Sequence, residues 1–188
     1  MISALILAGG KATRLGGIDK RELVVDGRTI FDRQCEVLAP RVAEIIVSAP
    51  RPVPGFRTVA DSIPDAGPLA GIAAGLAATT TPWLLVVAGD MPHLTGALID
   101  LVLSKIDPAI DAVGVRVGGL PEPLLCALQT RCASEVARRL DAGRLKASGL
   151  LTDGPLRVAW VEEAELRAID PSLHGLRNIN APEDLGSH

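Results

Sequence analysis

The 188-residue sequence is short of aromatic side chains and of cysteines. It contains no Tyr, two Trp and two Phe, so stacking of single-stranded nucleic acid on aromatic platforms is not expected. The cysteines, Cys35, Cys126 and Cys132, are odd in number and form no C-x-x-C pair. They therefore indicate neither a disulfide framework nor a zinc site, and we expect them to pack against the core or a helix face.

Long apolar runs and excess positive charge are also missing. No run approaches the ~18 apolar residues of a membrane span, and the first residues lack the pattern of a signal peptide. We therefore expect a cytoplasmic protein with no membrane partner. The net charge of −3 argues against nucleic acid as the main partner. Residues 1–60 nevertheless hold nine Lys/Arg against six Asp/Glu, while the rest holds ten against sixteen, which favours a small anionic ligand near the N-terminal strand.

A glycine-rich loop follows the first apolar strand. The strand covers residues 3–7, and the loop, residues 8–20, holds four glycines together with Lys11, Arg14 and Lys20. Glycines let backbone N–H groups approach a ligand, and the cations suit a polyanion, so the loop predicts a phosphate site. The spacing matches neither a P-loop nor the dinucleotide fingerprint. An ordinary glycine-rich turn is the alternative, which two glycine pairs and two cations at this spacing disfavour.

Apolar strands alternate with amphipathic helices along the rest of the chain. We expect further strands at residues 22–25, 44–48, 56–60, 83–88, 111–117, 122–128 and 156–161, and helices that begin near Thr29, Pro68, Thr95, Thr130 and Glu162. Continuously apolar strands are typical of a parallel sheet covered on both faces. With no repeat or linker, the sequence predicts one α/β domain over residues 1–188, a Rossmann-like three-layer sandwich with a mostly parallel sheet.

One carboxylate follows the most apolar strand. Residues 83–88 lead directly into Gly89 and Asp90, and ligands of open α/β sheets bind at the carboxyl ends of strands. A carboxylate is a hard ligand that suits a Mg²⁺ shared with substrate phosphates. Asp90 capping the following turn is the alternative, although Thr95 is better placed to cap the next helix.

Several motifs together resemble one family. Leu7-Ala8-Gly9-Gly10, Arg14-Leu15-Gly16 and Asp19-Lys20 resemble the signature of the MobA-like nucleotidyltransferases. Further segments resemble the family in the same order along the chain, namely Gly-Pro-Leu-Ala-Gly at residues 67–71, Pro-Leu-Leu-Cys-Ala at 123–127 and Asn-Ile-Asn-Ala-Pro-Glu-Asp-Leu at 178–185. The resemblance implies a nucleotide-diphospho-sugar transferase type of fold and the transfer of GMP from GTP to the phosphate of the molybdopterin cofactor, with release of pyrophosphate and a need for Mg²⁺.

The resemblance also implies roles for particular residues. The nucleotide is expected to contact the backbone of Leu7, Ala8 and Gly9. Gly10 and Arg14 are expected near the triphosphate, Lys20 at the α-phosphate, and Asp90 on Mg²⁺. Arg14, Lys20 and Asp90 form the implied catalytic set.

Two further residues match or depart from the family pattern. Asp61 matches a family aspartate that contacts nucleotide, and a carboxylate can accept from both N1–H and the N2 amine of guanine. Ser48 stands where many members carry Asn, so a nucleotide contact there is in doubt. The two asparagines of residues 178–180 hold backbone or substrate, or else the segment is a turn that starts a helix.

Other functions remain open at this point. Related enzymes transfer CMP to the same pterin or act on sugar phosphates, although the motifs at residues 67–71 and 178–180 favour guanylyl transfer. A non-catalytic protein that binds nucleotide and delivers the cofactor is disfavoured by Arg14, Lys20 and Asp90. Molybdoenzyme apoproteins and other cofactor-synthesis proteins are compatible partners. No Ser-His-Asp or Cys-His set occurs, and we expect His93 and His174 at the surface or in loops.

Overall fold

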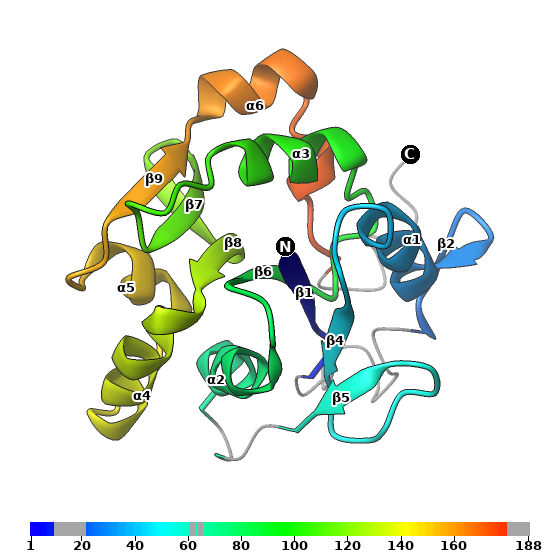
Figure 1. Cartoon of the computed structure of the whole chain (residues 1–188). Helices are drawn as coiled ribbons and strands as arrows, with labels where there is room; N and C mark the ends of the chain where they lie inside the picture. Colours follow the sequence, from blue (N-terminus) through cyan, green and yellow to red (C-terminus); the bar gives the residue numbers. More distant parts are fainter. Residues whose placement is uncertain (10–21, 61–62, 64–65, 180–188) are drawn as a thin grey trace.

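The computed structural model describes residues 1–9, 22–60, 63 and 66–179. In chain order, the elements of this part are β1 (Ile2–Leu7), β2 (Val24–Val25), β3 (Arg28–Thr29), α1 (Ile30–Leu38), β4 (Ile45–Ser48), β5 (Arg57–Val59), α2 (Pro68–Ala78), β6 (Trp83–Ala88), α3 (Gly96–Ser104), β7 (Ala112–Val117), β8 (Leu120–Gln129), the 3₁₀ helix η3 (Thr130–Cys132), α4 (Ala133–Asp141), α5 (Ala147–Thr152), β9 (Val158–Val161), α6 (Glu163–Ile169) and the 3₁₀ helix η4 (His174–Leu176), as labelled in Figure 1.

The described residues form a seven-stranded sheet in the order β5-β4-β1-β6-β8-β7-β9. Strands β5, β4, β1 and β6 pair in parallel, and β7 and β9 are also parallel to each other. Strand β8 pairs antiparallel with both of its neighbours. The predicted α/β fold with a mostly parallel sheet is confirmed. The carboxyl ends of β1, β4 and β6 consequently lie at one edge of the sheet.

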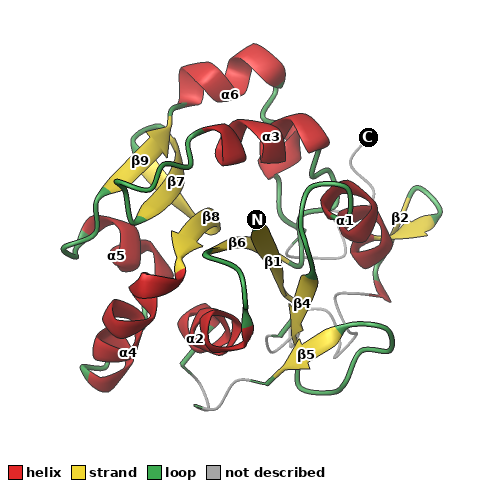
Figure 2. Ribbon diagram, viewed as in Figure 1, coloured by secondary structure: helices red, strands yellow, loops and turns green. Residues whose placement is uncertain are grey.

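Helices cover both faces of this sheet (Figure 2). On one face, α1, α3 and α6 supply Leu38, Ile99 and Leu166 to a core shared with β1 and β6. On the other face, α2, α4 and α5 pack a second core against the same strands. Burial on both sides explains why all six residues of β6 are apolar and buried. The predicted three-layer sandwich is therefore confirmed.

The first helix begins as its sequence predicts. The Thr29 hydroxyl accepts a hydrogen bond from the backbone N–H of Asp32 at 3.0 Å, which is the N-cap expected of this pattern. Before it, the β2–β3 hairpin turns at Asp26 and Gly27, whose φ angles are +48° and +77°. Asp-Gly is the preferred pair where both turn residues need positive φ. The hairpin and the cap together fix where α1 starts.

Residues 111–117 alternate Val with Ala, Gly and Arg, a pattern that predicts a half-buried strand, whereas the structure buries both faces of β7. Residues 112–115 are all buried, because β7 lies between β8 and β9 with helices on both faces. Gly114 makes room for a neighbouring ring rather than facing solvent: a Cβ added there would lie 2.5 Å from Cζ3 of Trp160. Alternation in the sequence reflects side-chain size here, and not exposure.

Two short helices were not predicted. Helix α5 has six residues, Ala147–Thr152, and η4 has three, so neither is long enough to show a clear apolar period. The apolar residues Leu98, Ile99, Val102, Leu103 and Ile106 predict a helix that reaches residue 106, whereas α3 ends at Ser104. None of the helices in the described part of the chain has the length and apolar character to cross a membrane.

The cysteines pack as expected. Cys126 and Cys132 are buried, Cys35 is half-buried, and all three are free thiols. Burial raises the pKa of the Cys126 thiol to about 12 and that of Cys132 to about 11. These thiols are therefore protonated at neutral pH, in keeping with a role in packing.

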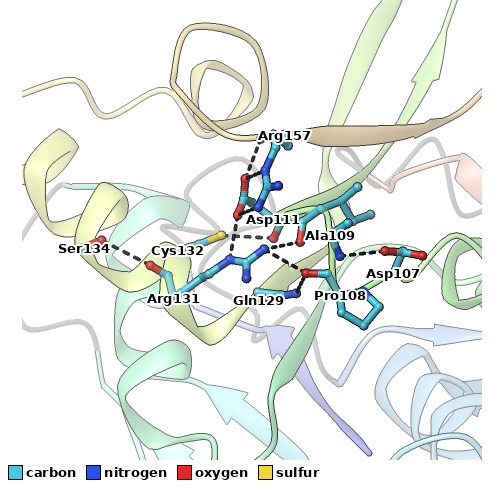
Figure 3. Close-up of polar contacts among 10 residues, drawn as sticks. Asp107, Pro108, Ala109, Asp111, Gln129, Arg131, Cys132, Ser134 and Arg157 are labelled. Carbon is cyan, nitrogen blue, oxygen red and sulfur yellow. Dashed lines mark hydrogen bonds and ion pairs between the residues drawn. The ribbon is translucent and has the colours of Figure 1, made fainter.

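Asp111, just before β7, joins three segments of the chain (Figure 3). Its carboxylate accepts from the backbone N–H of Arg157 at 2.8 Å and from Nε of Arg157 at 3.1 Å. It also accepts from Nε of Arg131 at 2.7 Å. The hydrogen bonds from Arg157, followed by that from Arg131, lower the pKa of Asp111 to about 2. The ionised carboxylate thus ties the start of β9 and η3 to β7.

We predict that Asp111→Asn destabilises the fold by about 1–2 kcal/mol at pH 7, since charge-assisted hydrogen bonds are lost. The folded pKa lies below the unfolded value of about 3.9, so the carboxylate stabilises the fold above pH ~4 and loses this effect as the pH falls toward 2. Urea denaturation between pH 2 and 7 should show the gap between parent and variant closing at low pH. Exposed Asp141→Asn is the control, and a pH-independent gap for Asp111→Asn would contradict this account.

Candidate functional site

The candidate site lies where the direction of the strand connections reverses. Strands β1 and β6 are neighbours, and α1, which follows β1, covers one face while α2, which precedes β6, covers the other. Open α/β sheets bind ligands in the crevice outside the carboxyl ends of such a strand pair. Here that position is taken by residues 7–9, which begin with the last residue of β1, and by residues 88–91, which begin with the last residue of β6. We call residues 88–91 the Asp90 turn.

The two chains meet in close backbone contact. The N–H of Gly89 donates to the carbonyl of Leu7 at 3.0 Å. A Cβ added to Gly89 would lie 2.8 Å from that carbonyl oxygen and 3.2 Å from Cα of Ala8. A side chain at position 89 would force the two segments apart, so glycine is required sterically. The Asp90 turn is thereby held directly against the start of the glycine-rich loop.

Strand β4 supports the same segment from its other side. Ser48 pairs in register with Leu7, and its carbonyl accepts from the N–H of Ala8 at 3.0 Å. The residue is 2% exposed, so it contacts the start of the loop through its backbone from within the sheet. Contact between its hydroxyl and a nucleotide remains a prediction.

The Asp90 turn is held by two segments distant in sequence. The carbonyl of Asp90 accepts from the backbone N–H of Ile179 at 2.9 Å. Nε2 of Gln34 in α1 donates to the carbonyls of Ala88, at 2.7 Å, and Met91, at 3.2 Å. The sequence does not single out Gln34, because the apolar residues of this helix, Ile30, Phe31, Cys35 and Leu38, predict a buried face without it. The structure instead buries residues 30, 34 and 38. These residues are four apart and lie on one face of the helix, and this spacing is the sequence feature that indicates burial of Gln34.

The donors present fit a magnesium ion shared with substrate. Asp90 is half-buried at the carboxyl end of β6. Among the residues that the structure describes, no group of three or more His, Cys, Asp or Glu side chains could hold a metal ion. Mg²⁺ commonly binds through one or two carboxylates, with substrate phosphates and water completing its shell. A single aspartate at this edge of the described sheet matches that mode, and does not match a metal cage built from protein alone.

Several predicted site residues lie outside the described residues. These are Gly10, Arg14, Lys20 and Asp61. Leu7, Ala8, Gly9, Ser48 and Asp90 are described, and the structure brings Leu7, Ala8, Ser48 and the Asp90 turn together. His93 and His174 are both half-buried, with ring centroids 3.8 Å apart; His93 lies in a loop and His174 in η4.

Comparison with known proteins points to one family. The MobA-like NTP transferase domain matches residues 4–154. A molybdenum cofactor guanylyltransferase of Desulfosudis oleivorans is 32% identical, over 98% of this chain and 92% of its own length. A crystal structure of molybdopterin-guanine dinucleotide biosynthesis protein A from Archaeoglobus fulgidus superposes with a TM-score of 0.80, at 25% identity, over 97% of this chain and 94% of that one.

The fold is shared more widely. The crystal structure of 2-C-methyl-D-erythritol 4-phosphate cytidylyltransferase from Thermus thermophilus covers 96% of this chain and 94% of its own, with a TM-score of 0.67 and 20% identity. At this level the likeness concerns the fold alone. It confirms the expected nucleotidyltransferase type of architecture.

We predict that Gly89→Ala destabilises the protein by about 1–3 kcal/mol, the usual range for an overpacked site, because the added methyl group meets backbone atoms that cannot rotate away. Gly154→Ala is the matched control, since its added Cβ first meets a side-chain atom, Oε1 of Glu135, at 3.2 Å. Urea denaturation should show a clearly smaller loss for the control. Equal stability of the two variants would refute the close contact.

Proposed function

Because the chain belongs to the MobA-like NTP transferase family, we propose that it transfers GMP from GTP to the phosphate of the molybdopterin-bound molybdenum cofactor and releases pyrophosphate. Nucleotidyl transfer is the activity of the family. The choice of GTP and of the pterin acceptor is supported by relatives named molybdenum cofactor guanylyltransferase that match nearly the full chain.

The observation that carries the proposal is the contact between the Asp90 turn and the end of β1. It brings a carboxylate next to the segment that opens the glycine-rich loop, at the sheet edge where α/β proteins bind nucleotides. A nucleotide whose triphosphate lies along this loop would have its phosphates near Asp90. That arrangement suits a reaction at phosphorus that needs a metal ion.

The reaction asks for positioning and charge neutralisation more than for covalent help. An acceptor phosphate oxygen attacks the α-phosphorus in line, the bond to the bridging oxygen breaks, and pyrophosphate leaves. When bound, Mg²⁺ would supply positive charge that offsets the negative charge developing at the phosphates. Asp90 would hold it, and no nucleophilic side chain is required.

The remaining residues have proposed roles in binding. The backbone of residues 7–9 contacts the nucleotide, Gly10 and Arg14 bind the triphosphate, and Lys20 stabilises charge at the α-phosphate. Asp61 accepts hydrogen bonds from guanine. Gly10, Arg14, Lys20 and Asp61 lie outside the described residues, so their roles rest on the family resemblance.

Pyrophosphate release tests the proposal, measured with the molybdopterin cofactor and Mg²⁺ and with GTP, CTP or ATP in parallel. The proposal expects release with GTP alone and none without acceptor. Release with CTP alone would support the same mechanism with a different nucleotide, and the protein would then be a cytidylyltransferase. No release with any nucleotide from folded, nucleotide-binding protein would favour a cofactor-delivery role and overturn the proposal.

We predict that Asp90→Asn abolishes Mg²⁺-dependent transfer while the thermal midpoint stays close to that of the parent, since the side chain keeps its shape and loses its charge. Asp141→Asn, on the exposed side of α4, serves as the control and should turn over normally. The measurement is the steady-state rate against Mg²⁺ concentration. Near-normal turnover by Asp90→Asn would remove the metal assignment.

For the loop, we predict that Lys20→Ala lowers turnover roughly 10²-fold or more, the usual effect of removing one oriented charge from a site that excludes water. Lys146→Ala removes an exposed cation at the start of α5 and is the control for net charge. Single-turnover rates with GTP at saturation compare the two. An unchanged rate in Lys20→Ala would exclude a role at the α-phosphate.

A further inference from the structure

We propose that Gln34 is a positioning residue of the active site. Its side-chain amide holds the backbone of the Asp90 turn and thereby sets the position at which the Asp90 carboxylate binds Mg²⁺. This inference rests on the proposed function, because it assumes that Asp90 holds the metal. It adds a residue that neither the sequence motifs nor the family resemblance singles out.

The contacts of Gln34 bracket the turn. Its Nε2 donates to the carbonyl of Ala88, the last residue of β6, and to the carbonyl of Met91, three residues later. An amide nitrogen has two N–H groups, so one side chain satisfies both carbonyls at once. The two residues between them are Gly89 and Asp90, so the separation between the ends of the turn is fixed by a single planar group.

Burial of the Gln34 amide away from water is unfavourable, so its hydrogen bonds indicate why a glutamine stands at this position. Gln34 is 0% exposed and lies one turn from Ile30 and one turn from Leu38, both fully buried apolar residues. Its Oε1 is buried without a hydrogen-bond partner among the residues described. An unpaired buried acceptor destabilises the fold, so the fold would gain little from glutamine here apart from the two carbonyls that it satisfies.

Other contacts complete the restraint on the turn. The N–H of Gly89 is bound to Leu7, and the carbonyl of Asp90 is bound to Ile179. With Gln34 on the carbonyls of Ala88 and Met91, the backbone of the turn is held at every residue. The direction of the Cα–Cβ bond of Asp90 is therefore set by hydrogen bonds to the backbone of the turn.

Helix α1 is itself well anchored, so it can transmit this restraint. Its N-cap is Thr29, and the N–H of Ile30 donates to the carbonyl of Leu23 at 2.9 Å. Ile30 packs in one small core with Leu23, Val25 and Ile179. The helix that carries Gln34 and the segment that binds the Asp90 carbonyl thus share a packing cluster.

The test uses Mn²⁺ as the probe, because its free form gives an EPR signal that falls on binding. Mn²⁺ is titrated into protein saturated with a non-hydrolysable GTP analogue, and the Mg²⁺ dependence of pyrophosphate release is measured beside it. Gln34→Met keeps the volume and removes both donors; Gln34→Asn keeps an amide that is one methylene too short. Leu38→Ala, one turn along the same buried face, is the control for lost stability.

We expect both Gln34 variants to need about 10- to 100-fold more metal for half-saturation, the usual effect of removing support from a metal site, with GTP-analogue affinity measured at saturating metal changed far less. Leu38→Ala should lower the thermal midpoint at least as much and leave the metal dependence unchanged. Unchanged Mn²⁺ binding in folded Gln34→Met, or an equal shift in Leu38→Ala, overturns the proposal. So does failure of both Gln34 variants to fold when Leu38→Ala folds, because Gln34 would then support the fold as a whole.

Asp90→Asn in the same titration separates this inference from the proposed function. If Asp90→Asn binds Mn²⁺ as the parent does, the metal site itself is wrong. If Asp90→Asn loses binding while Gln34→Met retains it, the metal site stands and only the positioning role of Gln34 fails.

Discussion

The close approach of Gly89 to Leu7 and Ala8 is the constraint on which the rest of the site depends. It requires a residue without a side chain, it uses the N–H of Gly89 and the carbonyl of Leu7 in one hydrogen bond, and it brings two strand ends together at one edge of the sheet. Three further contacts hold those strand ends in place. They are the pairing of β1 with β6, the hydrogen bond from the N–H of Ala8 to the Ser48 carbonyl in β4, and the hydrogen bonds from the Gln34 side chain.

The two-sided burial of the sheet explains how such a contact is maintained. Helices on both faces leave β1 and β6 almost wholly buried, so a shift of either strand would break packing on both sides at once. The sheet can therefore present its carboxyl edge as a rigid base. Asp90 lies at that edge, and the proposed metal ion would bind between its carboxylate and a substrate phosphate.

The fold was largely readable from the sequence, because continuously apolar strands are distinctive. The same logic predicts a carboxylate at the end of the most apolar strand, and the structure places Asp90 directly after Gly89 at the end of β6. Gln34 was missed because a buried glutamine looks like a surface one until its neighbours in space are known, and α5 was missed because six residues hold no clear period. The segment at Asn178 left two readings open; its neighbour Ile179 binds the Asp90 backbone, a contact across 89 residues of sequence that no local pattern encodes.

A crystal structure with a non-hydrolysable GTP analogue and Mn²⁺ would test the central claim most directly, because Mn²⁺ is located by its anomalous scattering. The account predicts a metal peak about 2.1 Å from a carboxylate oxygen of Asp90, with phosphate oxygens in the same shell and the nucleotide over residues 7–9. A metal or nucleotide bound away from the β1–β6 edge, with Asp90 taking no part, would contradict it.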